Sequence, residues 1–112
     1  MVASASLREG WGLSLTEAAA CGAPAVATKI AGHVDAVVDG VTGLLVPQPA
    51  DLGPALDRVL SDQDLRLRLG AAALARSATL NWDTAALATF TLLAKQAERR
   101  AGRRRSKSDL SR

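Results

Sequence analysis

The stretch REGWGLSLTEAAACGAP, residues 8–24, contains a glycine turn followed by a short helical pattern. Apolar residues from Leu13 to Cys21 have the spacing of a helix, and Gly22 with Pro24 two residues later is the usual stop signal. The preceding segment MVASAS, residues 1–6, has the character of the end of a strand. The stretch therefore predicts a strand, a glycine turn and a helix, in that order.

Two short β-type runs follow this helix. PAVAT, residues 24–28, is bounded by proline and polar residues, and GLLV, residues 43–46, is closed by Pro47. The residues between them, 29–42, include a candidate helix HVDAVVDG, residues 33–40. A connection of that length with a helix suits a parallel crossover, whereas a hairpin would need far fewer residues. The sequence therefore predicts an α/β fold with short parallel strands.

Three helical patterns follow Pro49 and complete the predicted fold. Ser61 and Asp64 fit the start of the second pattern. The third begins at Asp83 or Thr84, and its apolar face is expected to pack against another part of the protein. Trp82, just before it, is expected to be a packing anchor. The apolar faces of the three patterns consist of Leu52, Leu56, Val59 and Leu60, then Leu65, Leu69, Ala72 and Ala73, then Ala86, Phe90, Leu93 and Ala97.

Composition excludes several classes of protein. A chain of 112 residues forms one domain at most, and its 48% hydrophobic content excludes disorder for most of the length. No run of about eighteen apolar residues is available to span a bilayer, and no secretory segment follows Met1. The single cysteine, Cys21, excludes an internal disulfide framework and is expected to be a buried apolar residue. We therefore expect a cytoplasmic protein.

Excess positive charge is confined to the C-terminal end. Residues 1–97 carry seven Lys or Arg against nine Asp or Glu, whereas residues 98–112 carry seven against two. This basic tail has too few apolar residues to bury and is predicted to be disordered. It is either a solubilising end, which we favour, or a weak contact with an anionic membrane at its inner face, worth about 1 kcal/mol per basic residue. Nucleic-acid binding is not predicted, because no aromatic residue or known module accompanies the charge.

The turn EGWGLS, residues 9–14, has the features of a phosphate site. Gly10 and Gly12 permit positive φ and let a ligand approach the main chain. The first turn of the helix leaves N–H groups unpaired, and the helix dipole favours an anion there. Glu9 and Glu17 supply carboxylates that can accept paired hydrogen bonds from vicinal sugar hydroxyls. The expected ligand is a phosphate joined to sugars.

The same residues also have a purely structural interpretation. Ser14 to Glu17 match a capping box, in which Glu17 only satisfies the helix start for about 1 kcal/mol. The turn is also a weaker signal than a complete dinucleotide fingerprint. Asp35 and Asp39 are interpreted as polar faces or caps of the short helix. His33, the only histidine, has no second metal ligand nearby, so no metal site is predicted.

The segment from Ser4 to Pro47 resembles the C-terminal signature of the group 1, or family 4, retaining glycosyltransferases of GT-B fold. The likeness continues through LSDQDLRLRLG to NWD and covers roughly residues 4–95. It consists of two glutamates with seven residues between them, a small-residue helix, CG.P, a strand, a glycine turn and DG.TG.LV. The resemblance implies the C-terminal part of a Rossmann-like GT-B domain over residues 1–97, with the basic tail at 98–112.

The resemblance also implies an activity and a site. The reaction is the transfer of a hexose from a nucleotide diphosphate sugar to an acceptor with retention, with no cofactor or metal. Glu9, the candidate catalytic residue, would lie near the hydroxyls of the transferred sugar, and Glu17 would bind the ribose hydroxyls. Main-chain N–H groups of the turn would meet the sugar and diphosphate. The donor-binding set is Glu9, Gly10, Trp11, Gly12, Leu13 and Glu17.

Only part of such an enzyme is expected here. The family's first domain, with the acceptor site, and the basic pair that binds the diphosphate have no counterpart upstream of Met1. We therefore expect a C-terminal fragment whose partner is the missing N-terminal GT-B domain and whose stability alone is marginal. The alternative is a noncatalytic remnant, a nucleotide-binding or interaction module that turns nothing over.

Overall fold

The computed structural model describes residues 1–109, with side-chain surroundings described through residue 102. Two compact units result, Met1–Thr79 and a second that begins at Leu80. The first unit is built on a parallel sheet in the order β1-β2-β3, with strands Val2–Ser4, Ala25–Thr28 and Gly43–Val46. This sheet confirms the predicted α/β fold with short parallel strands.

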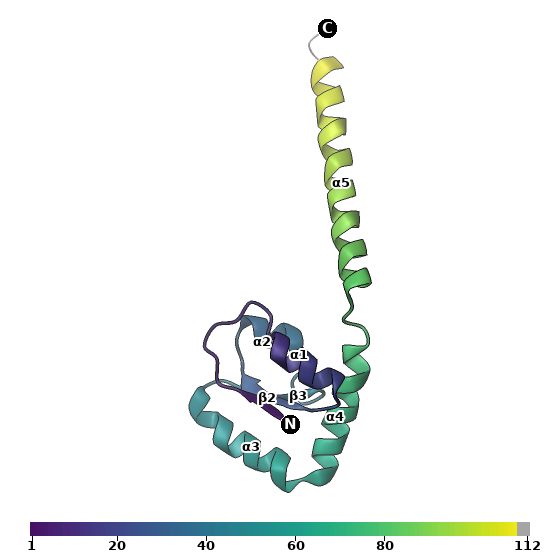
Figure 1. Ribbon diagram of the computed structural model, residues 1–112. Helices are drawn as coiled ribbons and strands as arrows, with labels where there is room; N and C mark the ends of the chain where they lie inside the picture. Colours follow the sequence, from purple (N-terminus) through teal and green to yellow (C-terminus); the bar gives the residue numbers. More distant parts are fainter. Residues whose placement is uncertain (110–112) are drawn as a thin grey trace. The chain divides into compact units, whose positions relative to one another are not determined.

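Two helices connect the strands and lie on the same side of them, as Figure 1 shows. Helix α1 (Leu13–Ala20) joins β1 to β2, and α2 (Ala31–Ala36) joins β2 to β3. Successive residues of a strand point to opposite faces of the sheet. In β2, Ala25 and Ala27 therefore pack on the side of α1 and α2, whereas Val26 packs on the opposite side. The core on this side consists of Leu15, Ala25, Ala27, Ala36, Val37 and Leu45.

The opposite face of the sheet is covered by the C-terminal part of the first unit. A 3-10 turn, η1 (Pro49–Asp51), leads into α3 (Leu52–Ser61), and α4 (Gln63–Ser77) packs against α3. The core on this side consists of Val26, Val46, Leu52, Val59, Leu65 and Leu69. Apolar cores on both faces of a parallel sheet are the rule for α/β proteins, because crossover helices cover both sides.

Helix α4 begins later than the sequence pattern suggested. Ser61 is the last residue of α3 rather than the start of the next helix, and Asp62 is the N-cap. The Asp62 carboxylate accepts a hydrogen bond from the Leu65 main-chain N–H at 2.9 Å. The carboxylate thereby satisfies a donor that the helix start leaves unpaired.

The connection before β3 differs from the prediction. The expected helix at 33–40 lies instead at Ala31–Ala36, because Val37 is extended with φ −120° and ψ 128°. Asp39 does not cap this helix: its Oδ1 accepts from the Leu45 N–H at 2.9 Å and so connects this segment to β3. The following Gly40 has φ 74°, which makes this segment a turn.

Cys21 is exposed, so the expectation of a buried cysteine is wrong. It is the C-cap residue of α1, and its N–H donates to the Ala18 carbonyl at 3.0 Å. At this position the chain leaves the helix toward Gly22, which has φ 69°. The thiol therefore lies outside the apolar core that the helix covers.

The second unit contains helix α5 (Trp82–Asp109). Its start is close to the predicted one, and the Asn81 side-chain oxygen accepts from the Thr84 N–H at 2.8 Å. The predicted apolar stripe is exposed: Phe90 is 70% and Leu93 65% accessible. Trp82 is 89% accessible, so within the second unit it is not the expected packing anchor.

Helix α5 extends into the segment from residue 98 that the sequence predicts to be disordered. Residues 98–109 continue the helix without interruption, whereas residues 110–112 of the predicted tail lie outside the described residues. Alanine, arginine and lysine are good helix formers, so low apolar content does not prevent propagation of a helix that has already begun. None of the helices that the structure describes combines the length and the apolar character needed to cross a bilayer.

Candidate functional site

The predicted donor-binding turn lies between β1 and α1, at the carboxyl edge of the sheet. Gly12 is the N-cap of α1 and has φ 75°, a conformation that favours glycine. Its carbonyl accepts from the N–H groups of Leu15 at 3.0 Å and Thr16 at 3.4 Å. No side chain caps this helix start. The uncapped first turn is the feature that suits an anion, because N–H groups and the helix dipole favour negative charge there.

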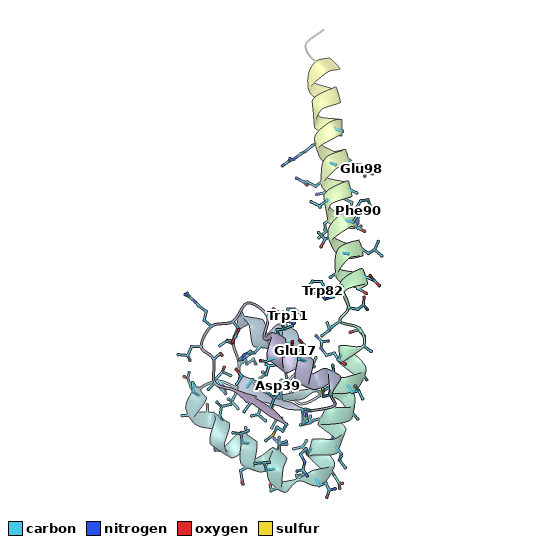
Figure 2. The ribbon with its side chains drawn as sticks, viewed as in Figure 1. Trp11, Glu17, Asp39, Trp82, Phe90 and Glu98 are labelled. Carbon is cyan, nitrogen blue, oxygen red and sulfur yellow. The ribbon has the colours of Figure 1, made fainter. Side chains whose placement is uncertain are left out.

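The capping-box interpretation of Ser14 and Glu17 is therefore wrong. Ser14 lies inside the helix rather than at its N-cap, which is Gly12. Glu17 lies in the second turn of α1 and is exposed, and Figure 2 labels it on this helix. Its carboxylate does not cap the helix and is therefore available to accept a hydrogen bond from a ligand hydroxyl.

Helix α2 packs against the turn at Gly32. This residue is buried, and a Cβ placed on it would come within 2.7 Å of the Glu9 carbonyl oxygen and 2.8 Å of the Trp11 nitrogen. Such separations are shorter than any side chain tolerates. Glycine at this position therefore allows the main chain of α2 to lie directly against the main chain of the turn.

Glu9 is held by a neighbour within the same loop. Its side chain is exposed, and Ser6 Oγ donates to Oε1 at 2.8 Å. Trp11 is 41% and Leu13 63% accessible, so both present apolar surface beside the helix start. The structure thus places all six predicted donor-binding residues in one loop and the first two turns of one helix.

The sequence analysis gave little weight to His33, but this residue is buried next to the turn and contacts the ends of two strands. His33 is buried at 1% accessibility. Its Nε2 lies 3.2 Å from Ser4 Oγ, and its Nδ1 lies 2.7 Å from the Thr28 carbonyl oxygen. Ser4 ends β1 and Thr28 ends β2, and carboxyl ends of adjacent parallel strands meet at one edge of a sheet. The position of Ser4 and Thr28 at the ends of two neighbouring strands was the sequence signal that could have identified their contact with His33.

A hollow of about 490 Å³ lies away from this turn, near the end of α1 and one face of α4. None of the six predicted site residues lines it. Its walls are Met1, Cys21, Gly22, Ala23, Pro24, Arg66, Leu67, Gly70, Ala71 and Leu74. Within the described part of the chain, no three His, Cys, Asp or Glu side chains gather into a cluster that could hold a metal ion.

Comparisons with known proteins agree with the fold. The family described as glycosyl transferases group 1 matches residues 1–76. A D-inositol 3-phosphate glycosyltransferase of Streptomyces bingchenggensis is 42% identical over 91 residues, which cover 80% of this chain and 20% of that protein. Sucrose-phosphate synthase from Thermosynechococcus elongatus superposes with a TM-score of 0.74 at 34% identity, covering 87% of this chain and 25% of that one.

A further similar structure carries a ligand. Anabaena HepE in complex with UDP has a TM-score of 0.64 and 26% identity, and the match covers 70% of this chain and 22% of that one. In each of these three proteins the chain corresponds to a quarter of the length or less.

Proposed function

Because this chain belongs to the group 1 glycosyltransferases, we propose that it is the nucleotide-sugar-binding part of a retaining GT-B enzyme. The reaction would transfer a hexose from a nucleotide diphosphate sugar to an acceptor, whose site would lie in an N-terminal domain. The solved structure of HepE contains UDP, and this supports a uridine nucleotide as the donor's leaving group. The observation that carries the proposal is the uncapped start of α1 with an exposed glutamate side chain on either side of it.

Five of the six predicted residues have a stated role in this proposal. The main chain of Trp11, Gly12 and Leu13 would meet the diphosphate, since the N–H groups of a helix start and its dipole favour an anion. Glu17, four residues beyond Leu13 and thus one turn along the same helix face, would accept hydrogen bonds from the ribose hydroxyls. Glu9 would do the same for the hydroxyls of the transferred sugar.

The same groups would assist the chemistry. Cleavage of the bond between sugar and diphosphate develops negative charge on the leaving phosphate. Preorganised donors aimed at developing charge stabilise a transition state, because they need no reorganisation during the reaction. The main-chain N–H groups at the start of α1 would supply part of this stabilisation. Glu9 would hold the sugar in place while the bond breaks.

Binding of UDP to the 112-residue chain tests the proposal directly. We expect Glu17→Ala to weaken UDP binding about tenfold, which corresponds to about 1.4 kcal/mol, because the ribose hydroxyls lose a charged acceptor. NMR titration with UDP gives the affinity of each variant. Asp57→Ala is the matched control, since Asp57 is an exposed acid on α3, on the other face of the sheet.

Two results would contradict the proposal. The first is that the NMR chemical shifts of the turn in the wild-type chain do not change on addition of UDP up to millimolar concentration. The second is a Glu17→Ala variant that binds UDP as tightly as the Asp57→Ala control.

A further inference from the structure

His33 makes its hydrogen bonds through both ring nitrogens, and both partners lie at strand ends. Nδ1 lies 2.7 Å from the carbonyl oxygen of Thr28 and 3.3 Å from its hydroxyl. Nε2 lies 3.2 Å from the hydroxyl of Ser4. A buried ring with both nitrogens engaged has one orientation, and the edge of β2 is thereby tied to the edge of β1.

These partners fix the tautomer of the neutral ring. The Thr28 carbonyl oxygen can only accept a hydrogen bond, so Nδ1 must carry the hydrogen. Nε2 is then the acceptor, and the Ser4 hydroxyl donates to it. The Thr28 hydroxyl donates to the Ser6 carbonyl, which leaves its own oxygen free to face Nδ1.

Ser4 and Thr28 in turn hold the main chain of Ser6 from both sides. The Ser6 N–H donates to Ser4 Oγ at 3.5 Å, and the Ser6 carbonyl accepts from the Thr28 hydroxyl. The side chain of this residue reaches the candidate donor site, because Ser6 Oγ donates to Glu9 Oε1 at 2.8 Å. Ser4 Oγ also lies 3.3 Å from Ser6 Oγ, but its single hydrogen is donated to Nε2 of His33, so the Ser6 N–H is the hydrogen-bonded link between the two serines. A path of hydrogen bonds that passes through the main chain of Ser6 therefore leads from the buried imidazole to an exposed carboxylate.

We propose that His33 is a positioning residue for Glu9, acting through Ser4, Thr28 and Ser6. The role of Glu9 in binding the transferred sugar rests on the proposed function above. An exposed glutamate samples several rotamers, and ordering such a side chain on binding weakens affinity by about two- to tenfold. The path from His33 orders the carboxylate before the donor arrives.

Substitutions that separate the two ring nitrogens test this role. The amide of Gln reaches the position of Nε2, whereas the amide of Asn reaches that of Nδ1. His33→Gln should keep the contact with Ser4 and preserve affinity for UDP-glucose. His33→Asn and Ser4→Ala should weaken UDP-glucose binding about two- to tenfold and leave UDP binding unchanged, because UDP lacks the sugar that Glu9 contacts. A merely structural role would weaken both ligands together.

Ser61→Ala is the control, because that hydroxyl donates only to carbonyls of its own helix, Asp57 at 2.8 Å and Arg58 at 3.5 Å. Equal UDP-glucose affinity in wild type, His33→Asn and Ser4→Ala would overturn the positioning role. So would a parallel loss of UDP affinity in these variants.

A measurement without donor keeps this test separate from the proposed function. His33 is the only histidine, so its ring nitrogens give unambiguous NMR signals. We expect the tautomer with hydrogen on Nδ1, and a shift of the Glu9 carboxylate carbon signal in Ser4→Ala and His33→Asn. Hydrogen on Nε2, or an unchanged Glu9 signal, would overturn the inference. If wild type binds UDP and UDP-glucose equally, the sugar-binding role of Glu9 fails, while the Glu9 signal still decides whether His33 positions it.

Discussion

At the scale of single residues, the candidate donor turn depends on a glycine that the turn itself does not contain. Gly32 lies in α2, and its missing side chain leaves room for the Glu9 carbonyl and the Trp11 nitrogen. We expect Gly32→Ala to destabilise the protein by about 1–3 kcal/mol, because the new Cβ meets rigid main chain rather than a flexible side chain. It should also displace the turn and weaken UDP binding. Urea unfolding and an NMR titration with UDP measure the two effects.

Gly53→Ala is the control for this prediction. Gly53 lies in α3, and nothing stands within 4 Å of the position where its Cβ would be. Alanine there should raise stability by about 0.5–1 kcal/mol through helix propensity alone. A Gly32→Ala variant as stable as wild type would show that α2 and the turn are not in contact in solution.

At the scale of elements, the start of α4 depends on one carboxylate. Asp62 accepts from the Leu65 N–H, and the helix that it caps carries Leu65 and Leu69 into the core. We expect Asp62→Ala to lower the free energy of unfolding by about 1 kcal/mol, since a helix-start donor loses its partner. Urea denaturation compares it with Asp57→Ala, an exposed acid inside α3 whose loss should cost less than half as much. Equal effects would contradict the capping role.

Sequence patterns located most elements of the first unit and the glycine turn before α1, but not the details that connect them. Helix α1 and strands β2 and β3 were predicted within one residue, because glycine and proline mark their ends. Helix α2 was misplaced, since the segment after it is held by two side chains that accept from main-chain N–H groups: Thr42 Oγ1 from Val38, and Asp39 Oδ1 from Leu45 in β3. The path from His33 was missed because Ser4 lies 29 residues away in sequence. Local periodicity carries no information on such a contact.

At the scale of the whole molecule, the open sheet limits stability. Strands β1 and β3 form the two edges, and no further strand among the described residues pairs with either. We expect the 112-residue chain to unfold on heating over a broad range with a midpoint below about 45 °C, the lower end for ordinary domains. NMR signals of core methyl groups of Val26 and Leu69 would report this transition. A sharp transition at higher temperature would contradict it.

Dilution is the control for this measurement. Exposed strand edges can pair between molecules, so association could raise the apparent midpoint. A midpoint that is independent of protein concentration would assign the observed stability to the single chain.

The two tryptophans differ in a way that gives the protein a built-in optical signal. Trp11 stands in the candidate donor turn, whereas Trp82 begins α5 and is almost fully accessible to water. With Trp82 replaced by phenylalanine, all indole emission would originate beside the start of α1. Changes in intensity or wavelength on adding a nucleotide would then report events at that turn alone, without an attached dye.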